Sequence, residues 1–297
     1  MTTSEPTTLF LDAMATRFEV ILYGAESSRL RAAGEQALEE IADAEKRLSM
    51  FRPGSETSRI NAFAAHQAVK IDARLYNLLK LAVRVSQATE GAFDITVAPA
   101  MQIWRNAGRL NRLPSDAEID SARELVGAEM ILFDDSDHTI RFAKEGVQID
   151  PGAIGKGFAI DIAVESLRES GITSALIHGG TSTIYAIGNQ INGQPWRIGV
   201  RDPATPDQSL RTVELCDASL SVSAPHGRLF ACEGREYGHV IDPRTGRSVR
   251  RTSLAAVWGP SATETDALST ALLVLGEEGL EPIRRAFPDY DGLVVGL

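Results

Sequence analysis

The chain has 297 residues, of which 43% are hydrophobic and 24% charged, so it can bury a substantial core and is not disordered throughout. Lys and Arg number 30 against 40 Asp and Glu, which gives a net charge of -10. This shortage of cations disfavours general binding to nucleic acid or to an anionic membrane surface. The two cysteines, Cys216 and Cys232, are too few for a disulfide framework and form no CxxC motif.

The start of the sequence carries no basic segment ahead of an apolar one, and no run of 18 apolar residues occurs anywhere. We therefore expect no membrane insertion and a cytoplasmic location. Residues 1–297 are expected to form a single domain, with residues 1–13 as a flexible N-terminal segment.

Apolar periodicity and capping residues predict the regular elements. Helices are expected at about 27–48, 73–89, 115–126, 156–170, 264–275 and 280–287. Strands are expected at 16–23, 130–135, 139–142, 174–180, 196–203, 220–224, 253–259 and 292–297, and loops at 51–61, 91–94 and 239–246. Helices and strands interleave without a regular βαβ rhythm, which favours an α+β fold over a doubly wound sheet.

The glycine-rich segment DPGAIGKGFAIDIA spans 150–163 and leads into a predicted helix. Glycines let a backbone approach a ligand closely, and the N-terminus of a helix attracts phosphate, to which Lys156 would add a positive charge. Asp150 stands where a P-loop needs glycine, and Gly157 stands where it needs Ser or Thr. The spacing therefore fits a phosphate site that is not a P-loop, or a helix start with a solvated lysine.

Asp266 and Thr270 lie four residues apart on a predicted helix and therefore share one face. A carboxylate and a hydroxyl are hard oxygen ligands that suit Mg²⁺, although the same residues also fit a polar helix start. His239 precedes a Pro-containing turn at 241–246. It is a candidate general base or a hydrogen-bonded turn residue.

Seven sequence blocks are spread over most of the chain. They are MATRFEV (14–20), LSMFRPGSETSRIN (48–61), GAFDITVAP (91–99) with Trp104 beyond it, DPGAIGKGFAID (150–161), IHGGTSTIYAIG (177–188), HVIDPRTG (239–246) and TDALSTALLVLG (265–276). Taken together, these blocks resemble the ApbE-like flavin transferases, a family of FAD:protein FMN transferases. All seven occur in the family's order, which makes the resemblance specific.

The resemblance implies an α+β domain with FAD in a central cleft and magnesium on the diphosphate. By position, the implied metal ligands are Asp266, Thr270 and the backbone carbonyl of Ala153. The implied FAD contacts are Met14, Met50, Ala92, Phe93, Asp94, Asp150, Lys156 and Ile241. The reaction implied is magnesium-dependent transfer of FMN from FAD to a Thr or Ser hydroxyl of an acceptor protein, with release of AMP. Either His239 or Asp150 would accept the proton.

Two departures from the family pattern stand out. Ala15 replaces a glycine, which is costly if that position needs a positive φ. The segment 223–230 contains Pro225 and His226 where the family has another pattern, so the acceptor side is expected to differ more than the FAD side. Three alternatives remain: an FAD pyrophosphatase that uses water, a noncatalytic FAD-binding protein, and a P-loop-like nucleotide enzyme, against which Asp150 and Gly157 argue.

Overall fold

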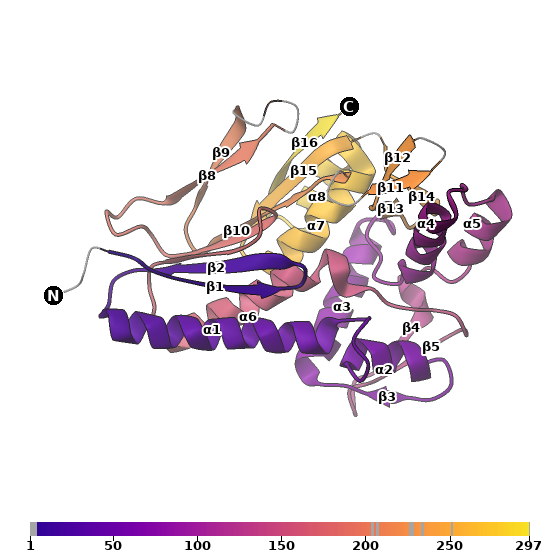
Figure 1. Ribbon diagram of the computed structural model, residues 1–297, viewed down its shortest axis with the longest axis horizontal. Coiled ribbons are helices and arrows are strands. Elements are labelled where there is room, and N and C mark those ends of the chain that lie inside the picture. The colour runs from indigo at the N-terminus through magenta and orange to yellow at the C-terminus, as the bar shows by residue number, and fades with distance from the viewer. Residues whose placement is uncertain are drawn as a thin grey trace.

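The computed structural model describes residues 5–202, 205, 208–225, 229–232, 235–250 and 252–296. Within these residues the largest element is a seven-stranded sheet in which each strand is antiparallel to its neighbours (Figure 1). Its strands, in spatial order, are β1 (Thr7–Ala13), β2 (Thr16–Leu22), β6 (Ala175–Gly179), β7 (Thr183–Ile187), β10 (Ala218–Ser223), β15 (Thr252–Gly259) and β16 (Asp291–Gly296).

Long helices pack on one face of this sheet, and a β-hairpin packs on the other. The helices are α1 (Ser27–Leu48), which contacts β1 and β2, α6 (Gly155–Glu169), which contacts β6 and β7, and α7 (Ala262–Leu275), which contacts β10 and β15. The hairpin of β8 (Trp196–Arg201) and β9 (Ser209–Leu215) covers an apolar cluster that includes Leu220 and Leu254. The central strands of the sheet are therefore covered on both faces, whereas the outer face of β1 is exposed, with Phe10 58% exposed.

The remaining elements gather beside the sheet, on the right of Figure 1. They are α2 (Glu56–Phe63), β3 (Val69–Lys70), α3 (Ala73–Ala88), α4 (Ala98–Leu110), α5 (Asp116–Arg123), β4 (Ile131–Asp134), β5 (Thr139–Phe142), β11 (Leu229–Cys232), β12 (Arg235–Gly238), β13 (Ile241–Asp242) and β14 (Arg247–Ser248). Short 3₁₀ helices occur at η1 (Ala128–Met130), η2 (Pro151–Ala153) and η4 (Gly276–Gly279), and α8 (Leu280–Ala286) precedes β16. A shared core that includes Ile60, Leu79, Phe93 and Leu268 joins this region to α7.

The α+β prediction is confirmed, and so are most of the long elements. Helix α1 buries Leu30, Leu38 and Ile41 at helical spacing, as its periodicity predicts. Ser115 and Glu118 form the expected capping box of α5, and β4 pairs with β5 as the expected hairpin.

Two predictions near the N-terminus are wrong. Residues 7–13 are not flexible, because they form β1, which pairs with β2 along its whole length and packs Leu9 and Leu11 toward α1. Residues 56–61 of the expected 51–61 loop are helical and belong to α2. Ser55 caps it by accepting from the Ser58 amide, and Thr57 and Ile60 are buried.

Among the described residues, no helix is both long and apolar enough to cross a membrane. The Cys216 thiol is free and exposed, whereas the side chain of Cys232 lies outside the described part of the structure.

Candidate functional site

Helices α6 and α7 meet with their backbones in direct contact. A methyl group on Gly157 would lie 2.1 Å from the carbonyl oxygen of Ala262, so residue 157 must be glycine for this approach. The glycine in the Lys156–Gly157 pair is thus explained by helix packing. It brings the start of α6 against the first turns of α7, where Asp266 lies.

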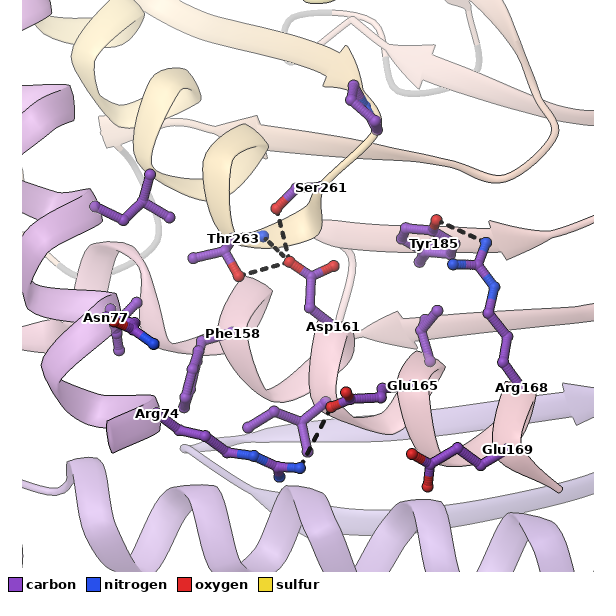
Figure 2. Close-up of a pocket in the computed structure, with 15 residues that line it drawn as sticks. Arg74, Asn77, Phe158, Asp161, Glu165, Arg168, Glu169, Tyr185, Ser261 and Thr263 are labelled. Carbon is purple, nitrogen blue, oxygen red and sulfur yellow. Dashed lines mark hydrogen bonds and ion pairs between the residues drawn. The ribbon is translucent and has the colours of Figure 1, made fainter. Parts of the chain in front are cut away.

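Each of the two helices supplies an aspartate that caps the other. Asp266 on α7 accepts a hydrogen bond from the Gly157 amide in the first turn of α6, at 3.1 Å. Asp161 on α6 accepts from the Ala262 and Thr263 amides of α7 at 2.9 and 2.8 Å. The Ser261 and Thr263 hydroxyls also donate to Asp161, at 2.7 and 2.6 Å (Figure 2). Carboxylates at helix N-termini satisfy amides that have no partner within the helix.

The Asp266 carboxylate is buried and forms an ion pair with Lys156. Its side chain is 4% exposed, and Lys156 Nζ lies 3.1 and 3.3 Å from its two oxygens. The Thr183 hydroxyl, at the start of β7, donates to Oδ1 at 3.3 Å. The structure therefore brings together two predicted site residues that are 110 positions apart in the chain. Sequence reasoning missed Thr183, which no spacing connects to α7.

A row of hydroxyls fixes α7 against strand β10. Ser219 and Ser221 both lie 2.9 Å from the Thr265 hydroxyl. Ser223 Oγ lies 2.8 Å from Ser269 Oγ and 3.3 Å from Thr270 Oγ1. Alternate residues of a strand point to one face, and a serine face ordinarily points to solvent. Here Ser219 and Ser221 are buried and Ser223 is partly buried, and Ser223 orients the Thr270 hydroxyl beside Asp266.

The oxygen donors around Asp266 fit a magnesium ion in chemistry. Thr270 donates to the Asp266 carbonyl at 3.2 Å and lies one turn further along α7, and η2, which contains Ala153, packs against α7. A carboxylate, a hydroxyl and a carbonyl are the hard ligands that Mg²⁺ takes, usually with retained water. Within the described residues, no group of three or more His, Cys, Asp or Glu side chains could hold a metal ion. An ion here would therefore depend on one carboxylate, which Lys156 now neutralises.

Asp150 lies between η2 and helix α4. One carboxylate oxygen accepts from the Gly152 amide at 2.8 Å, and the other lies 3.4 Å from the Arg105 guanidinium. The Asp150 amide donates to the Ile95 carbonyl at 2.8 Å, which joins this turn to the loop 91–97. Sequence reasoning missed Arg105, which also lies over the exposed Phe51 ring at 5.3 Å.

The predicted FAD contacts in the loop 91–97 have buried side chains. Ala92, Phe93 and Asp94 are 1%, 3% and 6% exposed. Asp94 accepts from the Ser86 hydroxyl and from both the amide and the hydroxyl of Thr96. Burial raises the pKa of Asp94, and these hydrogen bonds oppose the rise. Asp94 holds the loop in shape, so this loop can offer a ligand little besides its backbone.

His239 follows β12 directly, and the residue before it, Gly238, makes a second close backbone contact. A methyl group on Gly238 would lie 2.9 Å from Pro225 Cβ, which places the residue before His239 against the segment that follows Ser223. His239 itself is partly buried. Ile241 is 4% exposed and packs with Trp104 and Tyr237, so its side chain belongs to a core rather than to an open surface.

The two predicted methionine contacts, Met14 and Met50, lie near the C-terminal end of α1. Met14 and Ala15 form the turn between β1 and β2 with φ values of 51° and 59°. Position 15 therefore does need the left-handed conformation, and alanine occupies it at a cost. Glu45 of α1 accepts from the Met14 amide. Met50 is partly buried and follows Leu48, whose side chain packs against Gly155 at the start of α6.

The atypical segment 223–230 is described in part. Ser223 and Pro225 make the contacts given above, whereas His226 and residues 227–228 lie outside the described residues. The same holds for the side chains of residues 229 and 230.

A cavity of about 590 Å³ lies between α3, α6, β7 and the start of α7 (Figure 2). Arg74 pairs with Glu165 across it, and Arg168 bonds the Tyr185 hydroxyl. Residues of the predicted FAD and metal site do not line this cavity, although all of them are described. It is therefore separate from the Lys156–Asp266 pair.

Comparison with known proteins gives one consistent family. The ApbE family model matches residues 14–293. The FAD:protein FMN transferase of Vibrio cholerae serotype O1 is 30% identical over 258 residues, which cover 86% of this chain and 75% of that protein. The FAD:protein FMN transferase of Treponema pallidum is 29% identical over 284 residues, covering 91% of this chain and 78% of that protein.

Solved structures agree over almost the whole chain. The ApbE protein of Thermotoga maritima matches with a TM-score of 0.89 at 28% identity, covering 98% of this chain and 94% of that one. The apo form of the flavinyl transferase ApbE of Pseudomonas stutzeri matches with a TM-score of 0.84 at 25% identity, covering 99% and 92%. With the fold, the ordered motifs and the family model in agreement, the chain belongs to the ApbE family.

Proposed function

We propose that this protein transfers FMN from FAD to a Thr or Ser hydroxyl of an acceptor protein, with magnesium, and releases AMP. The name that the curated relatives carry, FAD:protein FMN transferase, supports the reaction. The observation that carries the proposal here is the Lys156–Asp266 pair beside Thr270, because phosphoryl transfer requires neutralised phosphate charge in a fixed position.

The chemistry is one displacement at the FMN-side phosphorus of FAD. The acceptor hydroxyl oxygen forms a bond to that phosphorus, and the bond between the phosphorus and the bridging oxygen breaks. AMP leaves with the electron pair of the broken bond. The hydroxyl proton passes to a base of the protein, and the FMN phosphate ends as an ester of the acceptor residue.

Four of the predicted residues take charge-neutralising roles in this scheme. Asp266, Thr270 and the Ala153 carbonyl would hold magnesium, which when bound supplies positive charge to the diphosphate. Lys156 and the first amides of α6 would hold nonbridging oxygens. Ser223 orients Thr270, and Asp161 keeps α7 seated on α6.

We assign the base to His239 rather than to Asp150. Both Asp150 oxygens already accept hydrogen bonds, one of them from an arginine, which suits a group that shapes the 150–153 turn. His239→Ala should slow transfer by roughly 10²- to 10⁴-fold and leave FAD affinity nearly unchanged. The matched variant, Asp150→Asn, keeps an acceptor for the Gly152 amide. A larger rate loss in Asp150→Asn than in His239→Ala would reverse the assignment.

The test of the function is FAD turnover with and without acceptor. The purified protein is incubated with FAD and Mg²⁺, alone and with peptides that carry a central Thr, Ser or Ala, while AMP release and the peptide mass are followed. The expected result is a mass gain of one FMN unit on the Thr or Ser peptide, stopped by a chelator. Release of FMN and AMP at the same rate without peptide would identify a pyrophosphatase, and no turnover would identify a binding protein.

A further inference from the structure

We propose that Lys156 is an exchangeable counter-ion: it neutralises Asp266 while the metal is absent and moves to the FAD diphosphate when the metal arrives. The idea rests on the proposed function, because it assumes that Asp266 binds a divalent cation and that FAD binds beside it. In this exchange Lys156 competes with the metal for Asp266, in addition to binding the phosphate.

The contacts of Asp266 show that ammonium and metal exclude each other. Oδ2 accepts from the Gly157 amide and Oδ1 from the Thr183 hydroxyl, and Lys156 Nζ lies within 3.3 Å of both oxygens. A divalent cation binds a carboxylate oxygen at about 2.0–2.6 Å. It would then lie within a few ångströms of the ammonium in a poorly solvated place, where like charges repel strongly.

Of these partners, Lys156 is the one that can leave. The Gly157 amide belongs to the backbone of α6, and Thr183 has a short side chain at the start of β7. The lysine has a flexible four-carbon stem and a side chain that is 22% exposed. It is the second residue of α6, a helix of 15 residues, so its head can turn from Asp266 toward an anion at the helix N-terminus.

Energetics make the exchange favourable only when both ligands are present. Without the metal, a buried Asp266 lacking Lys156 would be an uncompensated charge, which is costly. Without FAD, a displaced Lys156 would lose its only described carboxylate partner. Each ligand therefore removes a cost that the other would otherwise face, and the coupling must be reciprocal.

The first arm of the test measures metal binding in the FAD-free protein. Mn²⁺ serves as the probe, and its affinity is read by electron paramagnetic resonance for the wild type, Lys156→Met and Lys156→Arg. Removal of the competing cation should tighten Mn²⁺ binding about 10-fold in Lys156→Met. Lys156→Arg keeps the cation and should stay close to the wild type.

The second arm measures FAD binding in metal-free buffer, by quenching of flavin fluorescence. Asp266→Asn releases Lys156 from its ion pair, so FAD should bind about 5-fold or more tightly than to the wild type. This sign is opposite to that expected if Asp266 merely supported the pocket. The double variant Lys156→Met/Asp266→Asn should lose the gain.

Circular dichroism establishes that each variant is folded, and the second arm decides alone if Lys156→Met does not fold. Unchanged or weaker Mn²⁺ binding in folded Lys156→Met, or unchanged or weaker FAD binding in Asp266→Asn, overturns the proposal. Both arms are equilibrium measurements without acceptor. A failed exchange with intact FMN transfer is therefore distinguishable from a failed function with intact exchange.

Discussion

Asp161 and Asp266 play reciprocal parts in the contact between α6 and α7, yet the groups that contact their carboxylates differ in kind. Each aspartate caps the helix that the other belongs to. The partners of Asp161 are the amides and hydroxyls of residues 261–263. Asp266 has one such amide and one hydroxyl, but its closest charged partner is the Lys156 ammonium.

This difference separates a scaffold group from a ligand group. Backbone amides and short hydroxyl side chains cannot move away without unfolding the helix start, so Asp161 is permanently occupied. An ammonium on a flexible stem can leave, and another cation can take its place. The sequence alone gives both positions the same residue type. The kind of donor that contacts each carboxylate predicts its role.

The largest effect expected from this comparison is the loss of transfer in Asp266→Ala. Without the carboxylate, the metal is weakly held and the diphosphate charge is not neutralised, so the rate should fall more than about 100-fold. The rate of AMP release at saturating FAD and several Mg²⁺ concentrations measures it. Full activity at limiting Mg²⁺ would show that Asp266 is not a metal ligand.

Asp161→Ala should instead reduce stability. The start of α7 loses the acceptor of two amides and two hydroxyls, although its N-cap Ser261 remains, and this should lower the free energy of unfolding by about 2 kcal/mol. Urea denaturation measures the loss, and Asp161→Asn, which keeps one acceptor, should lose less. The rate of transfer per folded molecule should fall far less than in Asp266→Ala. A variant with normal stability and no transfer would place Asp161 among the ligands.

Much of this arrangement is predictable from the sequence, and the remainder depends on distant contacts. Helix α1 and the capping box at Ser115 have local signals, and the structure confirms both. Asp266 and Thr270 are predictable as a pair because four residues on a helix place them on one face. Lys156 and Asp266 are each recognisable, but their ion pair joins positions 110 residues apart, and no local pattern encodes it.

The serines of β10 show the reverse case, in which a local pattern is present but suggests the wrong environment. Ser219, Ser221 and Ser223 read as a polar strand face that would meet water, yet they face Thr265 and Ser269 of a helix that follows later in the chain. Strand β1 lacks a local signal for a different reason. Its apolar residues Leu9, Phe10 and Leu11 are consecutive rather than alternating, so the strand becomes evident only when β2 is beside it.

Ala15 departs from the family pattern at the turn before β2, and we expect this departure to affect stability. Its φ of 59° costs an alanine about 1 kcal/mol, and glycine removes that cost. Ala15→Gly should therefore raise the free energy of unfolding by up to about 1 kcal/mol. Ala32→Gly, at an exposed position in α1, is the matched control and should lower it by a similar amount. Destabilisation in both variants would show that the turn gains nothing from glycine.

Asp94 extends the comparison to a third carboxylate, one whose partners, like those of Asp161, are neutral. Burial is the largest influence on the pKa of Asp94 and raises it above the ordinary value of 3.8. The folded protein therefore holds this proton more tightly than the unfolded chain. The contribution of Asp94 to stability must then fall as the pH rises from 3.8 through the pKa of the folded state.

Asp94→Asn removes this titration and keeps an acceptor for Thr96, so its pH-independent cost should be within about 1 kcal/mol. Urea denaturation at a series of pH values should show the wild type losing stability relative to Asp94→Asn as the pH rises. A wild type that instead gains relative stability would mean that the hydrogen bonds from Ser86 and Thr96 outweigh burial. FAD affinity should be nearly the same in both proteins, because the Asp94 side chain faces the loop that it holds. A large loss of affinity in a stably folded Asp94→Asn would move this carboxylate from the class of Asp161 to that of Asp266.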